Sequence, residues 1–401
     1  MQHAQEHRAG PLAGLRILDL TRLLPGPVAT LHLADLGADV IKIEDPQLGD
    51  YARTLGTGQQ AADGQDSAYF RMINRNKRGL CLDLKQPEGV EIFLRLARDA
   101  DVIIESFRPG VVDKLGIGYA TVAAINPRIV YCAISGYGQD GPYRHLAGHD
   151  INYLGYAGVL GQIGREGSDP AIPNFQIADL LGGALTATTG LLAAVIEARQ
   201  TGQGRHVDVS MTDSVLAHTY FAMLRLDQHG RSAPAGGDVL SGGVPCYGVY
   251  RCRDGRHMAV GALEGKFWQL CCGVLERPDW IARQFDPALR TDMAALFATR
   301  DRDDWAARFA PVDCCVTPVL SPEEALVNEQ IAARGMVIRD DPADLGLTQF
   351  APPLRLSGHS FRIRQPAPGV GEHNRDILAE AGYSPAEIER LFASGALGQA
   401  G

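Results

Sequence analysis

The sequence lacks any run of five or more basic residues, and its formal net charge is −9. Proteins that hold nucleic acid or an anionic membrane surface usually carry clustered Lys and Arg. Neither is therefore expected as a partner. A small anionic ligand is compatible with this composition, because a few local cations can outweigh the overall sign.

The chain also lacks a CxxC pair, and its first ten residues contain no apolar signal region. Eight cysteines are present, and four of them form two adjacent pairs. Zinc sites need suitably spaced ligands, and disulfide frameworks are typical of secreted chains. We expect free thiols, a cytoplasmic protein and no metal site.

A dinucleotide-binding fingerprint is missing as well. The first predicted strand is followed by TRLLPGPVA, which contains no GxGxxG. Pro25 and Pro27 would remove two backbone donors that a pyrophosphate needs. NAD binding is not expected, although Glu44 lies about where a ribose-binding acid would be.

Long apolar segments are rare, and only residues 177–196 have the length of a membrane span. This segment contains Asp179 and several Gly and Thr residues, and no other segment is similar to it. We predict a buried helix rather than a transmembrane one, and no membrane partner.

Short apolar segments alternate with helical ones through the first half of the chain. The helical stretches are 27–38 and 87–100, and a hairpin is expected at 246–263, with its turn at Asp254-Gly255. The alternation predicts a mostly parallel sheet flanked by helices, an α/β fold. The predicted strands are 15–21, 39–44, 79–84, 101–106 and 128–135.

His149 follows Gly148 at the start of a helical run in LAGHDINYLGYAG. The helix dipole disfavours imidazolium there, which would leave the ring neutral and able to accept a proton. Backbone N–H groups of the first turn could bind an oxyanion. The alternative is an N-terminal capping pair formed with Asp150.

Asp179 is a lone carboxylate near the start of an otherwise uncharged helix. Its burial costs free energy unless something compensates the charge. The helix N-terminus could do so, or the carboxylate could serve as a catalytic base or nucleophile. The small residues after it would let another backbone pack closely. Glu264, taken alone, is only an acid at the end of a strand.

A basic set lies in the first half of the chain, with several members expected at the carboxyl edge of the sheet. It would suit a polyanionic ligand such as a nucleotide with phosphates, and the alternative is solvated surface charge. The set comprises Lys42, the NRNKR block at 74–78, Arg108 and Lys114.

The chain resembles the family III CoA-transferase and racemase group over nearly its full length. The stretches that carry the resemblance include PLAGLRILDLTRLLPGP, LADLGADVIKIEDP, NRNKRGLCLDLK, ESFRPGVVDKLGIGY, AGHDINYL, ADLLGGAL, TGQGRHVDVSM and GGVPCYGVYRCRDG. The resemblance implies a Rossmann-like large domain formed from both chain ends, with a smaller α+β domain between them. It also implies an interlocked homodimer whose active site is shared between the subunits. The expected segments are 1–225, 226–335 with the linker and small domain, and 336–401 returning to the large domain.

Two reaction classes share this fold. Transferases use one carboxylate as a nucleophile, which by resemblance is Asp179. Racemases of the α-methylacyl-CoA type use a His and an Asp on opposite faces of the acyl α-carbon, here His149 and Asp179, with Glu264 supporting the histidine. Transferases usually have another residue in place of the histidine. The resemblance therefore favours an epimerase acting on a 2-methyl-branched acyl-CoA.

The same resemblance implies that CoA enters as part of the acyl-CoA thioester and that no cofactor is needed. The residues expected to bind CoA or substrate are Lys42, Asn74, Arg75, Asn76, Lys77, Arg108, Lys114, Gly148, Asp150, Asn152 and Tyr153.

Three departures from the racemase pattern leave the transferase reaction as an alternative. Asp45 stands where racemases commonly carry an Arg, and the segment 49–70 is more typical of transferases. Phe175 stands four residues before Asp179, where racemases have an Asn; Asn174 lies one step earlier. A non-catalytic CoA-binding protein is the third reading, but both members of the acid–base pair are present.

Overall fold

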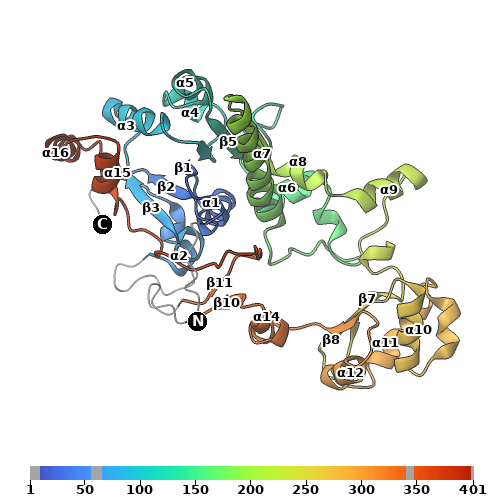
Figure 1. Cartoon of the computed structure of the whole chain (residues 1–401). Helices are drawn as coiled ribbons and strands as arrows, with labels where there is room; N and C mark the ends of the chain where they lie inside the picture. Colours follow the sequence, from blue (N-terminus) through green and yellow to red (C-terminus); the bar gives the residue numbers. More distant parts are fainter. Residues whose placement is uncertain (1–9, 56–65, 340–346, 399–401) are drawn as a thin grey trace, which may run out of the picture. The chain divides into compact units, whose positions relative to one another are not determined.

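The computed structural model describes residues 10–55, 66–339 and 347–398 (Figure 1). The chain divides into two compact units. The first contains the described residues up to 157, residues 175–218 and those from 335 onward; the second contains residues 158–174 and 219–334. The second unit thus includes 158–174 and 219–225, which the sequence analysis assigned to the large domain.

A six-stranded sheet lies at the centre of the first unit. Its order is β3-β2-β1-β4-β5-β6, and every neighbouring pair is parallel. The predicted α/β fold with a parallel sheet is therefore confirmed. Its strands are β1 (Arg16–Asp19), β2 (Asp39–Glu44), β3 (Lys77–Cys81), β4 (Val102–Glu105), β5 (Val130–Ser135) and β6 (His206–Ser210).

Helices connect these strands, as a parallel sheet requires. In α3, Pro87 occupies the first turn, and Ile92, Phe93 and Leu96 are buried in the same apolar cluster as Leu18 of β1. The elements of this unit are η1 (Tyr51–Arg53), α1 (Pro25–Asp35), α2 (Ala68–Asn74), α3 (Pro87–Ala97), α4 (Val111–Lys114), α5 (Tyr119–Ile125), α6 (Asp150–Tyr156), the π-helix η3 (Ala178–Leu185), α7 (Thr186–Thr201), α8 (Met211–Leu216), β10 (Val337–Ile338), β11 (Gln349–Phe350), α15 (Asn374–Glu380) and α16 (Pro385–Ser394).

The strand order reverses between β1 and β4. In open parallel sheets, ligands bind outside the carboxyl ends of the strands at such a reversal. The segments that leave β1 and β4 meet there, since the amide of Arg22 donates to the hydroxyl of Ser106 over 3.3 Å. The fold therefore marks the loops after Asp19 and Glu105 as a candidate binding edge.

Residues Ala178–Thr201 form one continuous helix from η3 and α7. By length and composition alone it could cross a membrane. Within the protein, 39% of its apolar window is buried. The predicted buried helix is thus only half right: η3 packs on α1 and α8, while Leu185 and Ile196 are 48% and 58% exposed.

The C-terminal segment packs on the edge strand β3. The amide of His373 donates to the carbonyl of Gly79 over 3.0 Å, and the amide of Cys81 donates to the Asn374 side chain over 2.8 Å. The last helices therefore cover the edge of the sheet that begins with β3. This C-terminal segment contains two short helices, α15 and α16.

The second unit has its own core, built around Trp268, Trp280 and Phe297. The predicted hairpin is confirmed, because β7 and β8 pair antiparallel and Gly255 takes the left-handed φ of +82° that its turn requires. The elements are η2 (Leu160–Gln162), α9 (Tyr220–His229), η4 (Val239–Ser241), β7 (Tyr247–Arg251), β8 (His257–Gly261), α10 (Gly265–Val274), η5 (Pro278–Arg283), α11 (Leu289–Phe297), α12 (Arg302–Phe309), β9 (Val316–Pro318), α13 (Pro322–Leu326) and α14 (Glu329–Ala333).

Candidate active site

His149 is the N-cap residue of α6, one position before the first turn in which we expected it. Its side chain is exposed. Its amide donates to the side-chain oxygen of Asn152 over 3.0 Å, and its carbonyl accepts the amides of Asn152 and Tyr153. The backbone of His149 is therefore fixed while its imidazole faces outward.

The first-turn amides of α6 are only partly used. Those of Asn152 and Tyr153 bond to the His149 carbonyl. Within the described part of the chain, the Asp150 and Ile151 amides donate no hydrogen bond. Two donors beside His149 are thus available to an oxyanion.

Gly148 and Gly136 allow the ring of Tyr153 to lie against the turn that carries His149. A Cβ atom at Gly148 would come within 2.6 Å of this ring, and one at Gly136 within 2.2 Å. The Tyr153 hydroxyl donates to the Gly148 carbonyl over 2.5 Å. Gly148 and Tyr153 therefore support the turn that carries His149. Their contact with substrate stays a prediction.

Asp179 lies in the first turn of η3 and is half-buried. Burial, with a smaller contribution from the negative charge of Asp150, raises the pKa of this carboxyl to about 7. A carboxyl with such a pKa is found in both protonation states near neutral pH. π-Helical turns are rare and occur frequently at functional sites.

Asp150 connects α6 with η3. Its Oδ1 atom accepts hydrogen bonds from the amides of Ala178 and Asp179, over 2.6 and 3.0 Å. It follows His149 directly in the chain. The Asp150 side chain therefore connects the start of α6, next to His149, with the start of η3, which carries Asp179.

Two phenols lie close to the Asp179 carboxylate. Burial, followed by the charge of Asp179, raises the pKa values of Tyr69 in α2 and Tyr153 in α6. Sequence reasoning missed Tyr69, and no local pattern marks it, because it reaches Asp179 only through the packing of α2. Tyr69 belongs to the segment 49–70, of which residues 56–65 lie outside the described part.

Arg22 was also missed. It follows β1 at the reversal of strand order, and its guanidinium lies 5.5 Å from the ring centroids of both Tyr51 and Phe107. Leu23 beside it has a left-handed φ of +67°, which is strained for such a residue and typical of functional sites. A cation directly after the first strand was the signal that could have pointed to Arg22.

The NRNKR block, whose residues are predicted to bind CoA, lies at the start of β3. The strand begins at Lys77, so Asn74, Arg75 and Asn76 precede it, at the amino end of β3 rather than at the carboxyl edge. Arg75 is buried and pairs with Asp35 over 2.7 Å. Asn76 donates to the same carboxylate over 2.8 Å, and its own side-chain oxygen accepts the amide of Arg364.

Two of the three lysines of the basic set, Lys42 and Lys77, are fully buried. Lys42 pairs with Asp50 over 2.8 Å and donates to the carbonyl of Thr21 over 3.0 Å. Lys77 contacts Asp19 at 3.3 Å and the Asn74 side chain at 2.8 Å. Each charge is thus compensated within the protein, and Lys42 braces the loop after β1. Their direct contact with CoA stays a prediction.

Arg108 and Lys114 are exposed. Arg108 follows β4 at the reversal of strand order, close enough to Tyr153 to influence its pKa. Lys114 lines a shallow pocket of about 500 Å³ together with Lys85 and the start of α3. Both side chains are accessible at the surface. Their contact with a CoA phosphate stays a prediction.

The departures from the racemase pattern have visible consequences. Asp45 accepts the amides of Gln47 and Leu48 in a tight turn and pairs with Lys85 over 3.1 Å. A lysine thus stands beside the position where racemases commonly carry an arginine. The side chain of Phe175, which stands where racemases have an Asn, is 56% exposed.

Glu264 lies in the second unit, in the short connection between β8 and α10, where it is the exposed N-cap residue of α10. Its carbonyl accepts the amides of Phe267 and Trp268. Its charge contributes, after burial, to the raised pKa of Cys315. Its support of His149 stays a prediction.

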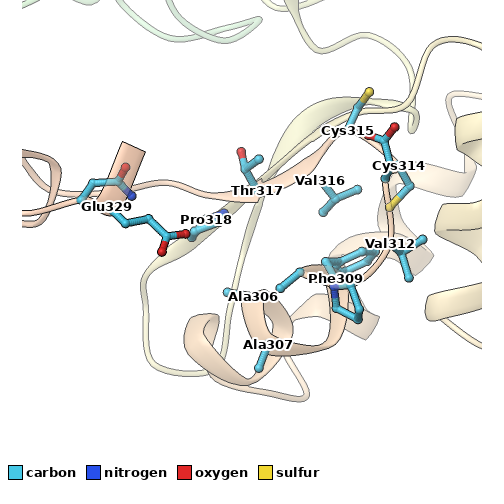
Figure 2. A pocket seen from close by; sticks show the side chains of 14 residues that line it. Ala306, Ala307, Phe309, Val312, Cys314, Cys315, Val316, Thr317, Pro318 and Glu329 are labelled. Carbon is cyan, nitrogen blue, oxygen red and sulfur yellow. The ribbon is translucent and has the colours of Figure 1, made fainter. Parts of the chain in front are cut away.

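The second unit also contains a pocket of about 700 Å³ between α12 and β9 (Figure 2). Apolar side chains such as Phe309 and Val316 line it together with polar groups, among them Thr317 and Glu329. Figure 2 shows the sulfur of Cys315 at the rim, turned away from the pocket. None of the predicted catalytic residues lines this pocket.

A family model described as CoA-transferase family III matches residues 12–374. The chain is 35% identical to an alpha-methylacyl-CoA racemase of Homo sapiens, over 95% of this chain and 96% of that protein. It is 32% identical to a succinyl-CoA:glutarate CoA-transferase of Mus musculus, over 97% and 91% of the two chains. A crystal structure of a CAIB/BAIF family protein from Brucella suis superimposes with a TM-score of 0.82 at 29% identity, covering 93% of this chain and all of that one (100%).

Proposed function

The chain belongs to CoA-transferase family III, and from this premise we propose that it is an epimerase of 2-methyl-branched acyl-CoA thioesters. The observation that carries the proposal is the link through Asp150. It joins a histidine at the start of α6 to a carboxylate at the start of η3. An acid–base pair of this kind can exchange a proton at one carbon centre.

In the proposed reaction, one of the two groups removes the α-proton of the thioester, and the C–H electron pair moves into the enolate. The other group then delivers a proton to the opposite face, and a new C–H bond forms. The amides of Asp150 and Ile151 are suited to stabilise the enolate oxygen. A raised pKa of Asp179, about 7, suits a group that alternates between base and acid near neutral pH.

We further propose that Arg22 and Arg108, at the reversal of strand order, and Lys114 meet the CoA moiety, while the buried lysines hold the loops that carry the site. The proposed reaction requires no cofactor. Glu264 is proposed to support His149 in a homodimer. The exposed apolar helix α9 is consistent with a self-association surface, because none of its residues is buried.

A second function stays open because transferases are about as similar to the chain as racemases are. In that case, ionised Asp179 would attack the thioester carbonyl and expel CoA as thiolate, leaving an acyl anhydride on the enzyme. An acceptor carboxylate would then be needed to complete the reaction. This second function does not require His149.

Deuterium exchange separates the two functions. A 2-methylacyl-CoA incubated with the protein in D₂O, without an acceptor acid, should exchange its α-proton, as followed by ¹H NMR. His149→Ala and Asp179→Asn should each slow the exchange by about 10²–10⁴-fold. Ser241→Ala, a change in the second unit outside the proposed site, serves as a control.

A transferase would give the opposite pattern. No branched acyl-CoA would exchange its α-proton, CoA would pass to an added dicarboxylate, and hydroxylamine would trap the acyl group on Asp179. Transfer that survives in His149→Ala, without any α-exchange in the unmodified protein, would overturn the epimerase proposal.

A further inference from the structure

Asp150 makes two backbone hydrogen bonds to a segment far away in the sequence. Its Oδ1 atom accepts the amides of Ala178 and Asp179, which are 28 and 29 residues away. Amides at the start of a helix have no partner within that helix, and a carboxylate binds them through strong, charge-assisted bonds. The Asp150 side chain therefore holds the first turn of η3.

The same residue opens α6 directly after His149. On the His149 side, the backbone is held by Asn152, which accepts the His149 amide over 3.0 Å, and by Tyr153, which donates to the Gly148 carbonyl over 2.5 Å. Little freedom is left between the His149 backbone and the Asp150 carboxylate. A single side chain thus sets the separation between the two helix starts.

We propose that Asp150 is a positioning residue, which acts through its carboxylate to hold His149 and Asp179 at a fixed separation and to keep a negative charge beside Asp179. This inference rests on the proposed epimerase function, in which both residues handle the same proton. It assigns to the Asp150 side chain a role separate from that of its backbone amide.

The surroundings of Asp179 agree with this role. From α6 it is faced by Asp150 and Tyr153, and from α2 by Tyr69. Helices α1 and α8 meet η3 at Gly183 through the uncharged residues Pro25 and Met211. Of these groups, Asp150 is the one carboxylate, and its charge raises the pKa of Asp179 further than burial alone does.

Two variants distinguish the effect of the hydrogen bonds that Asp150 accepts from the effect of its negative charge. Asp150→Asn keeps an oxygen that can accept both amides but removes the charge, whereas Asp150→Ala removes both. Asp208→Asn is the matched control, because its carboxylate also accepts a backbone amide, that of Gln139 over 3.0 Å, elsewhere in the same unit. The full-length protein is used throughout.

Hydrogen exchange of the Ala178 and Asp179 amides and ¹³C NMR titration of Asp179 need no substrate. In Asp150→Asn, amide protection should stay within about threefold of the unmodified protein. The midpoint of the Asp179 titration should move down from about 7. In Asp150→Ala, amide protection should fall by about tenfold or more. Asp208→Asn should change neither.

The α-exchange assay then supplies the functional readout. Asp150→Ala should lower kcat by about 10²-fold, with a KM change below about threefold, because the reacting groups are displaced while CoA contacts persist. In Asp150→Asn, the acidic limb of the rate profile should move to lower pH. Unchanged amide protection in Asp150→Ala, or an Asp179 midpoint that moves no more in Asp150→Asn than in Asp208→Asn, overturns the inference.

The two proposals fail in different ways. If the protein transfers CoA and never exchanges the α-proton, the epimerase proposal fails, while the exchange and titration measurements still decide whether Asp150 positions Asp179. If Asp150→Ala does not fold, the titration of Asp150→Asn decides by itself.

Discussion

At the scale of single residues, the carboxyl of Asp179 is the group whose protonation matters most. Its pKa in the folded protein, about 7, lies above the ordinary value of 3.8, which applies to the unfolded chain. The unfolded chain therefore releases this proton at lower pH than the folded protein does. The contribution of Asp179 to stability is fully present below about pH 4 and is lost as the pH rises through 7.

This dependence of stability on pH can be tested with Asp179→Asn, which replaces the acid by a neutral group of the same shape. The Tm of the variant should exceed that of the unmodified protein, by a margin that grows between about pH 4 and pH 7 and is constant above. Scanning calorimetry across that range measures it. Glu88→Gln, at an exposed position of α3, should show no such growth; an Asp179→Asn margin independent of pH would contradict the raised pKa.

Fully buried and partly buried cations should respond differently to substitution. Lys42→Met should destabilise the fold by about 3–5 kcal/mol, because it leaves the buried carboxylate of Asp50 unpaired. Arg22→Ala should change stability by less than about 1 kcal/mol, yet weaken CoA binding by about tenfold, as measured by calorimetric titration. If Lys42→Met kept full stability and lost only CoA affinity, the lysine would be a ligand and not a brace.

At the scale of elements, η3 depends on two glycines that allow close packing. A Cβ atom at Gly182 would lie 2.8 Å from the Met211 carbonyl, and one at Gly183 would lie 2.6 Å from the side chain of Pro25. Either contact would force α8 or α1 away from the helix that carries Asp179. The expectation that small residues here let another backbone pack closely is thereby confirmed.

Gly182→Ala should therefore destabilise the protein by about 1–3 kcal/mol and lower activity, because the backbone carbonyl of Met211 cannot move away as a side chain can. Gly155→Ala in α6 is the matched control, since nothing lies within 4 Å of the added Cβ atom. It should be neutral or stabilising by up to about 1 kcal/mol. Equal Tm values for the two variants would contradict the packing argument.

The elements themselves were predictable because their signals are local. Apolar runs and amphipathic spacing located β1, β2 and α3, and the turn residues Asp254-Gly255 located the hairpin. The chemistry near Asp179 was predictable only in part. The roles of Asp150, Tyr69 and Arg22 depend on side-chain contacts across the fold, which no spacing along the chain encodes. The buried ion pairs of Lys42 and Arg75 were hidden for the same reason, since a basic residue usually lies on the surface.

At the scale of the whole molecule, α9 (Tyr220–His229) is a helix that buries none of its residues in a hydrophobic core. It contributes large apolar side chains, yet none of its residues is buried. The exposed fractions are 62% for Phe221, 50% for Met223, 51% for Leu224 and 43% for Leu226. Amphipathic surface helices of globular proteins bury one apolar stripe. An exposed apolar surface of this kind is typical of a protein–protein interface.

The proposed occupant of this surface is a second copy of the chain, as expected for a homodimer with a shared active site. Phe221→Glu combined with Leu224→Glu should place two desolvated charges in the interface and prevent association. Light scattering should then give a mass near 43.1 kDa, against about twice that value for the unmodified protein. Gln228→Glu, an exposed change on the same helix, should leave the mass unchanged. Because Glu264 and His149 are proposed to meet across the dimer, the monomeric variant should be folded but inactive in α-exchange. A monomeric unmodified protein, or a monomeric variant that retains full activity, would contradict the shared site.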